Sequence, residues 1–375
     1  MRQTVTAKLQ ILVNPSDKQI LCDTMKAYSD ACNYVSEYIY KSHNLSRYSV
    51  QENTYYQIRE IYDLRSQMAV SCVRTVIAKY KTILENQSKW IKPVFKLPQL
   101  DLVWNRDYSL NTKNDTFSVN SLNGRIKVDF YKNGFDKYFA EACKFGTAKL
   151  VFKHGSFFLH IPVSYEIEEL VKDDVSNVVG IDRGIRFIAT TYDSNGKTNF
   201  YDGNAIKQKR GHYKALRKEL QQVHTSSSRR RIRAIGQREN RWMQDINHCI
   251  SKALVESNPD GTLFVLEDLT GIRSATERVL VKDRYVSVSW SYYDLEQKLT
   301  YKALKNHQLV EKVNPAYTSQ TCPKCGHTEK GNRDKHKHLF CCKNCGYKSN
   351  DDRIGAMNLY RMGIELLVPD TVATE

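Results

Sequence analysis

The chain has 375 residues, which is enough for two or three domains with separate hydrophobic cores. It carries 57 Lys and Arg against 41 Asp and Glu, and the formal net charge of +16 favours a polyanionic partner such as nucleic acid. No apolar run approaches the ~18 residues of a membrane-spanning helix, and the first residues lack the apolar stretch of a secretory signal. We therefore expect an intracellular protein that has no membrane partner.

The N-terminal part predicts a strand followed by helices. Residues 1–13 alternate between polar and apolar side chains, which is the period of a strand. The period changes at about residue 17, and the sequence predicts a second helix from about 53 to 86. The apolar face of the first helix consists of Leu21, Met25, Tyr28, Cys32, Val35 and Ile39.

Residues 90–170 have the pattern of strands joined by turns. Residues 124–130 alternate, and residues 147–152 and 157–162 flank a Lys-His-Gly-Ser turn, as in a hairpin. If the first strand joins this sheet, the helices are an insertion in a small β-barrel.

A different pattern begins at residue 178. Three strands are predicted at 178–182, 187–192 and 197–202, then a long helical stretch broken at 224–228. Further elements follow: a strand at 262–267, a helix at about 291–306, a strand at 308–313 and a C-terminal helix. Three antiparallel strands, helix, strand, helix, strand, helix is the order of a ribonuclease-H-like fold, so we expect an α+β, multidomain protein.

Five of the ten cysteines lie between residues 322 and 345. Two Cys-x-x-Cys-Gly repeats supply four thiolates, the ligand set of a structural zinc ribbon, and without a secretory signal this spacing favours a metal site over disulfides. Rival ligands are Cys341, His336 and His338. The first would break the repeat, and a histidine would leave a good thiolate unused. The expected zinc ligands are Cys322, Cys325, Cys342 and Cys345.

Three acidic residues are candidates for catalysis. Asp182 and Glu267 each end an apolar strand, and Asp352 opens the last helix. A buried carboxylate cluster is unfavourable without cations, and two Mg²⁺ ions sharing these ligands would support phosphodiester cleavage. Asp268 and Asp351 are the adjacent alternatives that spacing alone does not exclude. Each acid also has an ordinary interpretation as a turn former, a surface acid or a helix cap.

Residues 207–241 form a strongly basic stretch, with twelve Lys or Arg against Glu219 and Glu239. This excess is larger than solubility requires and favours contact with phosphates. The predicted nucleic-acid-binding residues here are Lys207, Lys209, Arg210, Lys214, Arg217, Arg229, Arg230, Arg231, Arg233, Arg238 and Arg241.

Taken together, these motifs resemble the TnpB family, which is encoded by insertion sequences and has long been labelled as putative transposases. The resemblance is dense over residues 178–363 and covers only the layout of the N-terminal half. Two positions depart from the family pattern: Asp351, where the family commonly has Ala, and Ile354, where it has a small or amide residue. The motifs are Gly180-Ile-Asp-Arg-Gly184, Leu266-Glu-Asp-Leu269, Val313 to Gly326, Asn332-Arg333, Phe340 to Tyr347, and Asn350-Asp-Asp352 with Ala356 and Asn358.

The resemblance implies an RNA-guided DNA endonuclease of the prokaryotic cytoplasm, acting at the nucleoid with a guide RNA and target DNA as partners. It implies a single RuvC site formed by Asp182, Glu267 and Asp352, with catalytic Mg²⁺ and structural Zn²⁺, and strand contact by Asn332 and Arg333. The oligomeric state is left open. The implied domains are a wedge β-barrel (1–14 and 88–176), a helical recognition lobe (15–87), a RuvC nuclease domain (177–316 and 349–375) and a zinc ribbon (317–348).

Three alternative functions are compatible with parts of this pattern. A guided DNA-binding repressor would lack a carboxylate, whereas all three are present here. A true transposase would bind transposon ends as an oligomer, for which the sequence gives no indication. An unguided structure-specific nuclease would use the same chemistry, and a defined co-purified RNA would distinguish it from the guided enzyme.

Overall fold

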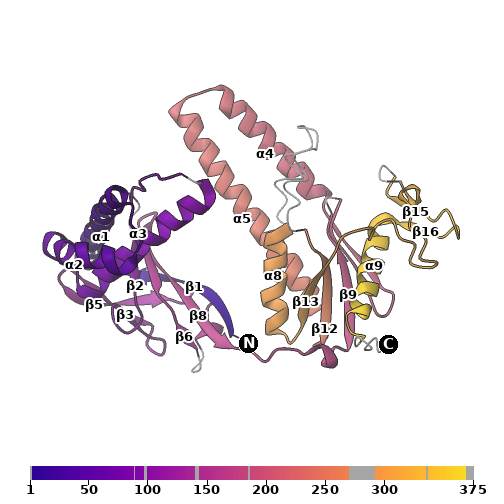
Figure 1. Ribbon diagram of the computed structural model, residues 1–375, viewed down its shortest axis with the longest axis horizontal. Helices are drawn as coiled ribbons and strands as arrows, with labels where there is room; N and C mark the ends of the chain where they lie inside the picture. Colours follow the sequence, from indigo (N-terminus) through magenta and orange to yellow (C-terminus); the bar gives the residue numbers. More distant parts are fainter. Residues whose placement is uncertain are drawn as a thin grey trace. The chain divides into compact units, whose positions relative to one another are not determined.

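The structure is a computed structural model that describes residues 2–87, 89–96, 99–139, 143–184, 186–269, 292–334 and 337–368. The chain divides into two compact units, Met1–Glu166 and Ile167–Glu375. Each unit combines helices with a β-sheet (Figure 1), so the chain has a mixed α and β architecture. Within the described ranges, no helix is both long and apolar enough to cross a membrane.

The first unit is built on one antiparallel sheet that forms a nearly closed barrel. The strand order is β2-β7-β8-β1-β5-β4-β3, with β6 beside β8. The first strand pairs with β8 along most of its length, which confirms that it joins the sheet predicted downstream. The elements are β1 (Arg2–Leu12), β2 (Gln99–Leu102), β3 (Tyr108–Asn111), β4 (Thr116–Ser121), β5 (Gly124–Tyr131), β6 (Lys144–Phe145), β7 (Ala148–Lys153), β8 (Ser156–Glu166) and a 3₁₀ turn, η1 (Asp136–Tyr138).

Three helices lie between β1 and β2: α1 (Pro15–Ser42), α2 (Arg47–Tyr62) and α3 (Ser66–Gln87). The predicted apolar face of α1 is buried throughout, as expected for a helix that packs against its neighbours. The prediction of one helix from about 53 to 86 is wrong, because one helix ends at Tyr62 and another begins at Ser66. Asp63 there adopts the left-handed conformation (φ 51°), which ends α2 and turns the chain into α3.

The second unit contains a five-stranded sheet with the order β11-β10-β9-β12-β13. β9, β10 and β11 are antiparallel, whereas β12 runs parallel to both β9 and β13. The element order is the one that the sequence predicts. The elements up to the last sheet strand are η2 (Lys172–Asp174), β9 (Asn177–Asp182), β10 (Phe187–Asp193), β11 (Thr198–Asp202), α4 (Asn204–Gln222), α5 (Ser226–Glu256), β12 (Thr262–Glu267), α8 (Tyr292–Lys305) and β13 (Leu309–Val313).

Helices cover both faces of this sheet (Figure 1), which explains why β9 and β12 are almost continuously apolar. On one face, Ile181 and Phe264 belong to a buried cluster that includes residues of α5 and α8. On the other face, Val178 and Val265 pack with Leu359 of α9 (Asp351–Glu365). The sheet is therefore buried on both faces, up to the strand ends where the acids lie.

A small three-stranded sheet is inserted between β13 and α9. It consists of β14 (Arg333–Asp334), β15 (Leu339–Cys341) and β16 (Lys348–Asn350), preceded by a 3₁₀ turn, η3 (Lys330–Asn332). β16 runs directly into α9, so this insertion fixes the start of the helix.

Candidate metal centres

Two of the predicted acids end neighbouring parallel strands. In the β9–β12 pairing, Ile181 lies opposite Leu266. Asp182 and Glu267 are the next residues on the two strands, so both carboxylates emerge at the same edge of the sheet. Each is partly exposed to solvent.

The third acid, Asp352, lies in the first turn of α9 and is 8% exposed. Asn350 caps this helix: its side-chain oxygen accepts hydrogen bonds from the backbone nitrogens of Asp352 (3.0 Å) and Arg353 (3.1 Å). An asparagine immediately before the first turn therefore holds Asp352 in a defined position.

Helix α9 lies unusually close to β9. A Cβ atom built on Gly180 would come within 2.1 Å of the carbonyl oxygen of Ala356, so only glycine fits there. One helical turn after Asp352, a Cβ on Gly355 would lie 2.9 Å from Cγ of Asp182. This close approach brings the strand-end carboxylate of Asp182 beside the helix-start carboxylate of Asp352.

The pKa of Asp182 reflects the nearness of the other two acids, whereas the pKa values of Glu267 and Asp352 are raised mainly by burial. Burial, and then the charges of Glu267 and Asp352, raise the pKa of Asp182 well above its usual range. Burial also raises the pKa of Glu267. Burial and the neighbouring charge of Asp351 raise the pKa of Asp352. Shifts of this kind indicate a site that requires positive charge to keep its carboxylates ionised.

The acids offer oxygen ligands of the kind that divalent cations take. Oδ2 of Asp352 is buried and has no hydrogen-bond partner in the part of the chain that the structure describes. Carboxylate oxygens are the ligands that Mg²⁺ prefers. Among the described residues, the carboxylate-containing group whose ligand atoms all lie within 4.8 Å of one another is His338, Asp351 and Asp352; Asp182 and Glu267 are not part of it.

Two neighbours fix the position of Glu267. The Thr318 hydroxyl donates a hydrogen bond to Oε1 of Glu267 (2.5 Å). The guanidinium of Arg183, which is 5% exposed, donates to the backbone oxygen of Glu267 and pairs with Glu296 (3.2 Å). Both residues lie within the family motifs, but the sequence assigns neither of them a role. The only signal for Arg183 is its place directly after Asp182, and its contacts with β12 and α8 require the folded sheet.

Asp351, the rival for the third position, is fully buried and has different partners. Its Oδ2 accepts a 2.9 Å hydrogen bond from Nε of Arg333. Its Oδ1 lies 3.4 Å from Nδ1 of His338. Arg333 also donates to Ser319 (2.9 Å), and its terminal nitrogen lies 3.9 Å from Oδ1 of Asp352. Arg333 therefore lies beside the carboxylates, which spacing in the sequence does not predict.

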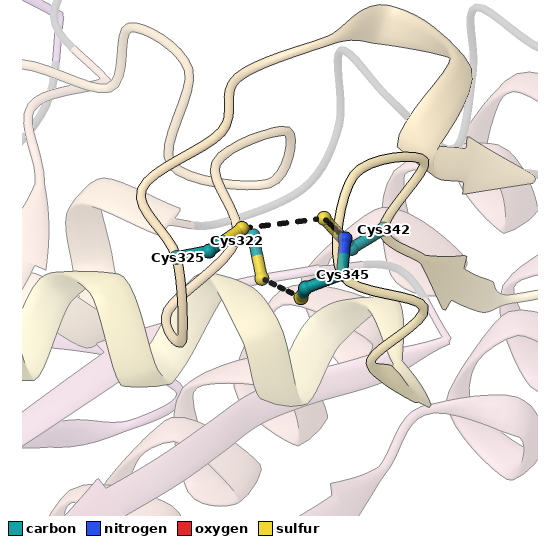
Figure 2. Close-up of side chains that lie close together, drawn as sticks. All are labelled: Cys322, Cys325, Cys342 and Cys345. Atoms are coloured by element: carbon teal, nitrogen blue, oxygen red, sulfur yellow. Dashed lines mark hydrogen bonds between the residues drawn. The ribbon is translucent and has the colours of Figure 1, made fainter.

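The four predicted cysteines come together in the loops and turns beside the inserted sheet (Figure 2). The sulfur atoms of Cys322 and Cys345 are 3.6 Å apart, as are those of Cys325 and Cys342, and all four lie within 4.8 Å of one another. Tetrahedral zinc with bonds of ~2.3 Å would separate its sulfurs by about 3.8 Å, so the cluster fits such an ion.

The rival zinc ligands do not join this cluster. Cys341 lies on β15 and is absent from the four-sulfur group. His338 groups instead with Asp351 and Asp352. His336 lies outside the described residues.

The inserted sheet packs directly on α9. Cys322, Phe340 and Cys342 form a buried cluster with Ile354 of α9, which is fully buried. Asn332, which was predicted to contact nucleic acid through the family resemblance, is 1% exposed. Its side chain bonds to the backbone of three ribbon residues: Gln320 (3.0 Å), His327 (3.3 Å) and Lys343 (2.9 Å). The structure thus gives Asn332 a packing role within the ribbon.

The predicted basic stretch forms a helical hairpin of α4 and α5 (Figure 1). Most of the predicted cations are exposed along it: Lys207, Lys209, Lys214, Arg229, Arg230, Arg231, Arg233, Arg238 and Arg241.

Arg210 and Arg217 differ from the other cations of the hairpin. Arg210 is 5% exposed and lies 3.3 Å from Glu239, which is 3% exposed. Arg217 is partly buried and also pairs with Glu239. These two arginines therefore join α4 to α5, and a buried guanidinium such as that of Arg210 is not available to a phosphate.

Two family models match parts of the chain. One, described as the TNB domain of Cas12f1-like proteins, matches residues 292–359. The other, described as a probable transposase, matches residues 160–270.

Curated relatives point in the same direction. A "CRISPR-associated endodeoxyribonuclease Cas12f1" from Syntrophomonas palmitatica is 31% identical over 210 residues, which are 52% of this chain and 40% of that protein. A "Putative RNA-guided DNA endonuclease InsQ" from Escherichia coli is 28% identical over 233 residues, 57% of this chain and 55% of the relative. The "TnpB-like protein MJ0751" from Methanocaldococcus jannaschii is 26% identical over 245 residues, 63% of this chain and 86% of the relative.

The chain spans about half the length of several curated relatives that it matches. Among solved structures, that of the "mini-RNA-guided endonuclease CRISPR-Cas_phi3" covers 96% of this chain and 92% of its own, with a TM-score of 0.56 and 11% sequence identity. At 11% sequence identity, this similarity is evidence for the fold alone.

Proposed function

Because this chain is a TnpB-type protein, we propose that it is an RNA-guided DNA endonuclease that cuts phosphodiester bonds at the Asp182, Glu267 and Asp352 site. The observation that supports the proposal is that Asp182 and Glu267 end neighbouring strands, and that the charges of Glu267 and Asp352 help to raise the pKa of Asp182. The proposal that an RNA guides cleavage comes from the names of the relatives: one is a "Putative RNA-guided DNA endonuclease", and another is a "CRISPR-associated endodeoxyribonuclease".

The proposed domain layout follows from this function. Residues 177–316 and 349–375 would form a ribonuclease-H-like RuvC domain, and residues 317–348 a zinc ribbon that contacts the target. Residues 1–14 and 88–176 would form the wedge barrel, and 15–87 the recognition lobe. The strand order of the second unit and the insertion of helices between β1 and β2 support this assignment.

In the proposed mechanism, the protein positions charge around a bound phosphodiester. Divalent cations, here Mg²⁺, would activate the attacking water and stabilise the leaving oxygen. Asp182, Glu267 and Asp352 would hold these ions. Thr318 and Arg183 keep Glu267 in place through their bonds to its carboxylate and backbone oxygens.

The ribbon and the hairpin would serve binding. Zn²⁺ held by Cys322, Cys325, Cys342 and Cys345 would cross-link the ribbon. The ribbon packs on α9 beside the carboxylates. The exposed cations of α4 and α5 would contact the phosphates of a guide RNA–target DNA duplex, while base pairing reads the sequence.

Sequencing the RNA that co-purifies with the protein, followed by cleavage of a DNA library with randomised flanks, tests the proposal. We expect one defined RNA and cleavage in Mg²⁺ beside a short common motif. Asp182→Ala should keep RNA-dependent DNA binding and lose cleavage. A variant that still cuts at the wild-type rate would show that the carboxylates are wrongly assigned, and cleavage without RNA would favour an unguided nuclease.

A further inference from the structure

Arg333 lies between two acids that follow one another in α9. Its Nε is 2.9 Å from Oδ2 of Asp351, whereas its terminal nitrogen is 3.9 Å from Oδ1 of Asp352. The first distance is that of a charge-assisted hydrogen bond, and the second is not. The guanidinium is therefore bound by Asp351 and stops short of Asp352.

The environment of Asp351 makes this pairing strong. Asp351 is fully buried, and His338 approaches its other oxygen at 3.4 Å. Arg333 is anchored from the ribbon side by its 2.9 Å bond to Ser319. An ion pair with one fully buried partner is costly to break, because the separated charge stays in a medium of low polarity.

Asp352, in contrast, keeps an oxygen for another ligand. Its Oδ2 is buried and has no hydrogen-bond partner among the residues that the structure describes. A buried carboxylate oxygen without a partner is unfavourable unless something binds it. A guanidinium released by Asp351 needs to move only a short distance to pair fully with Asp352, and it would then compete with a metal ion.

We propose that Asp351 is a positioning residue that binds Arg333 and so keeps Asp352 available to a divalent cation. The inference rests on the proposed function in one respect, the assignment of Asp182, Glu267 and Asp352 as metal ligands. Asp351 itself contacts Arg333 and His338, and its effect on the metal passes through the guanidinium.

Mn²⁺ binding to the zinc-loaded full-length protein tests this role without relying on cleavage. Asp351→Asn removes the charge that holds Arg333, and we expect about 10- to 100-fold weaker Mn²⁺ binding by calorimetry or by electron paramagnetic resonance of the free ion. Adding Arg333→Gln to this variant removes the competing cation and should recover most of the loss. Arg333→Gln alone should bind Mn²⁺ at least as tightly as the wild type.

Two controls define the site. Glu365→Gln removes an exposed carboxylate from the other end of the same helix and should leave Mn²⁺ affinity unchanged. Asp182→Asn should abolish the binding that is being measured. Zinc content and a cooperative thermal transition confirm that each variant is folded, and the double variant, which removes both charges of the buried pair, decides the matter if Asp351→Asn does not fold.

The outcomes separate the inference from the function on which it rests. Wild-type affinity in Asp351→Asn would overturn the inference. So would a loss that Arg333→Gln does not restore, because Asp351 would then act as a ligand or as a packing residue. Weaker Mn²⁺ binding in Arg333→Gln alone would overturn it too. If the wild type shows no Mn²⁺ binding that Asp182→Asn removes, the metal assignment in the proposed function fails.

Discussion

The carboxylate of Asp182 lies against the backbone of Gly355, so closely that a Cβ atom on Gly355 would be 2.9 Å from Cγ and 3.0 Å from Oδ2 of Asp182. This contact joins the end of β9 to the first turns of α9. It also means that the spacing between two of the candidate metal ligands depends on the absence of a side chain. A single methyl group at this point would have to displace either the carboxylate or the helix.

Gly355→Ala should therefore impair the metal site more than its small size suggests. We expect overpacking to lower the free energy of unfolding by about 1–3 kcal/mol. Displacement of Asp182 should slow cleavage by about 100-fold. Urea unfolding and single-turnover cleavage measure the two effects.

Gly211→Ala is the matched control, because Gly211 lies within α4 and has no atom within 4 Å of the added Cβ. It should raise the free energy of unfolding by about 0.5–1 kcal/mol and leave cleavage unchanged. Equal cleavage rates for the two variants would contradict the proposed importance of the Asp182–Gly355 contact.

The raised pKa values predict a pH-dependent stability in the absence of Mg²⁺. The folded state holds protons on Asp182, Glu267 and Asp352 at pH values where the unfolded chain has released them. The free energy of unfolding contributed by this site therefore falls as the pH rises from the ordinary carboxyl pKa of about 4 through the raised values. Mg²⁺ should reduce this penalty at neutral pH.

Asp182→Asn isolates the effect. In zinc-loaded protein freed of other divalent cations, this variant should unfold at a higher temperature than the wild type at pH 8, and the difference should shrink toward pH 4–5. Thermal unfolding followed by circular dichroism gives the comparison. A difference that does not change with pH would mean that the three acids do not repel one another in the folded protein.

The cysteine cluster predicts that two similar substitutions have different effects. Cys325→Ser should abolish stoichiometric zinc binding and loosen the ribbon, because metal binding in such sites contributes directly to folding. Cys341→Ser, on strand β15 and outside the cluster, should keep one zinc per chain. Metal analysis of the purified proteins and their thermal unfolding distinguish the two, and loss of zinc from Cys341→Ser would contradict the assigned ligand set.

The helical hairpin carries exposed cations, which we propose bind nucleic acid, and two arginines, Arg210 and Arg217, that pair with Glu239. Replacing Arg229, Arg230 and Arg231 together by Gln should weaken nucleic-acid binding and reduce the steepness of log affinity against log salt by about 2–3.

Arg210→Gln should instead lower the free energy of unfolding by about 3–5 kcal/mol, because it leaves Glu239 buried with its ion pairing weakened. Fluorescence anisotropy over a range of salt concentrations, together with urea unfolding, tests both; an unchanged slope in the triple variant would remove the hairpin from the binding surface.

The candidate site could be predicted largely because its residues stand at the ends of well-marked elements. The continuous apolar runs before Asp182 and Glu267 define two buried strands, and an asparagine before Asp352 marks a helix start. The repeated Cys-x-x-Cys-Gly spacing likewise specifies its four ligands locally. In each case the information lies within a few residues of the functional side chain.

What the sequence did not reveal depends on contacts between distant segments. In the sequence, Arg210 cannot be told from the other cations of the basic stretch. Its burial and its ion pair with Glu239 depend on how α4 packs against α5. The position of Arg333 beside Asp351 depends on how the ribbon packs on α9. The break at Asp63 has no glycine or proline to mark it, because the residue adopts its left-handed conformation in the folded chain.

The insertion of the ribbon between β13 and α9 has a consequence for shortened copies of this protein. A chain that stops before the ribbon would still contain every strand of the five-stranded sheet, with Asp182 and Glu267 in place. It would lack the helix that covers one face of β9, and with it the last acid of the site. Deletions from the carboxyl terminus should therefore abolish cleavage before they remove any of the exposed cations on its helical hairpin.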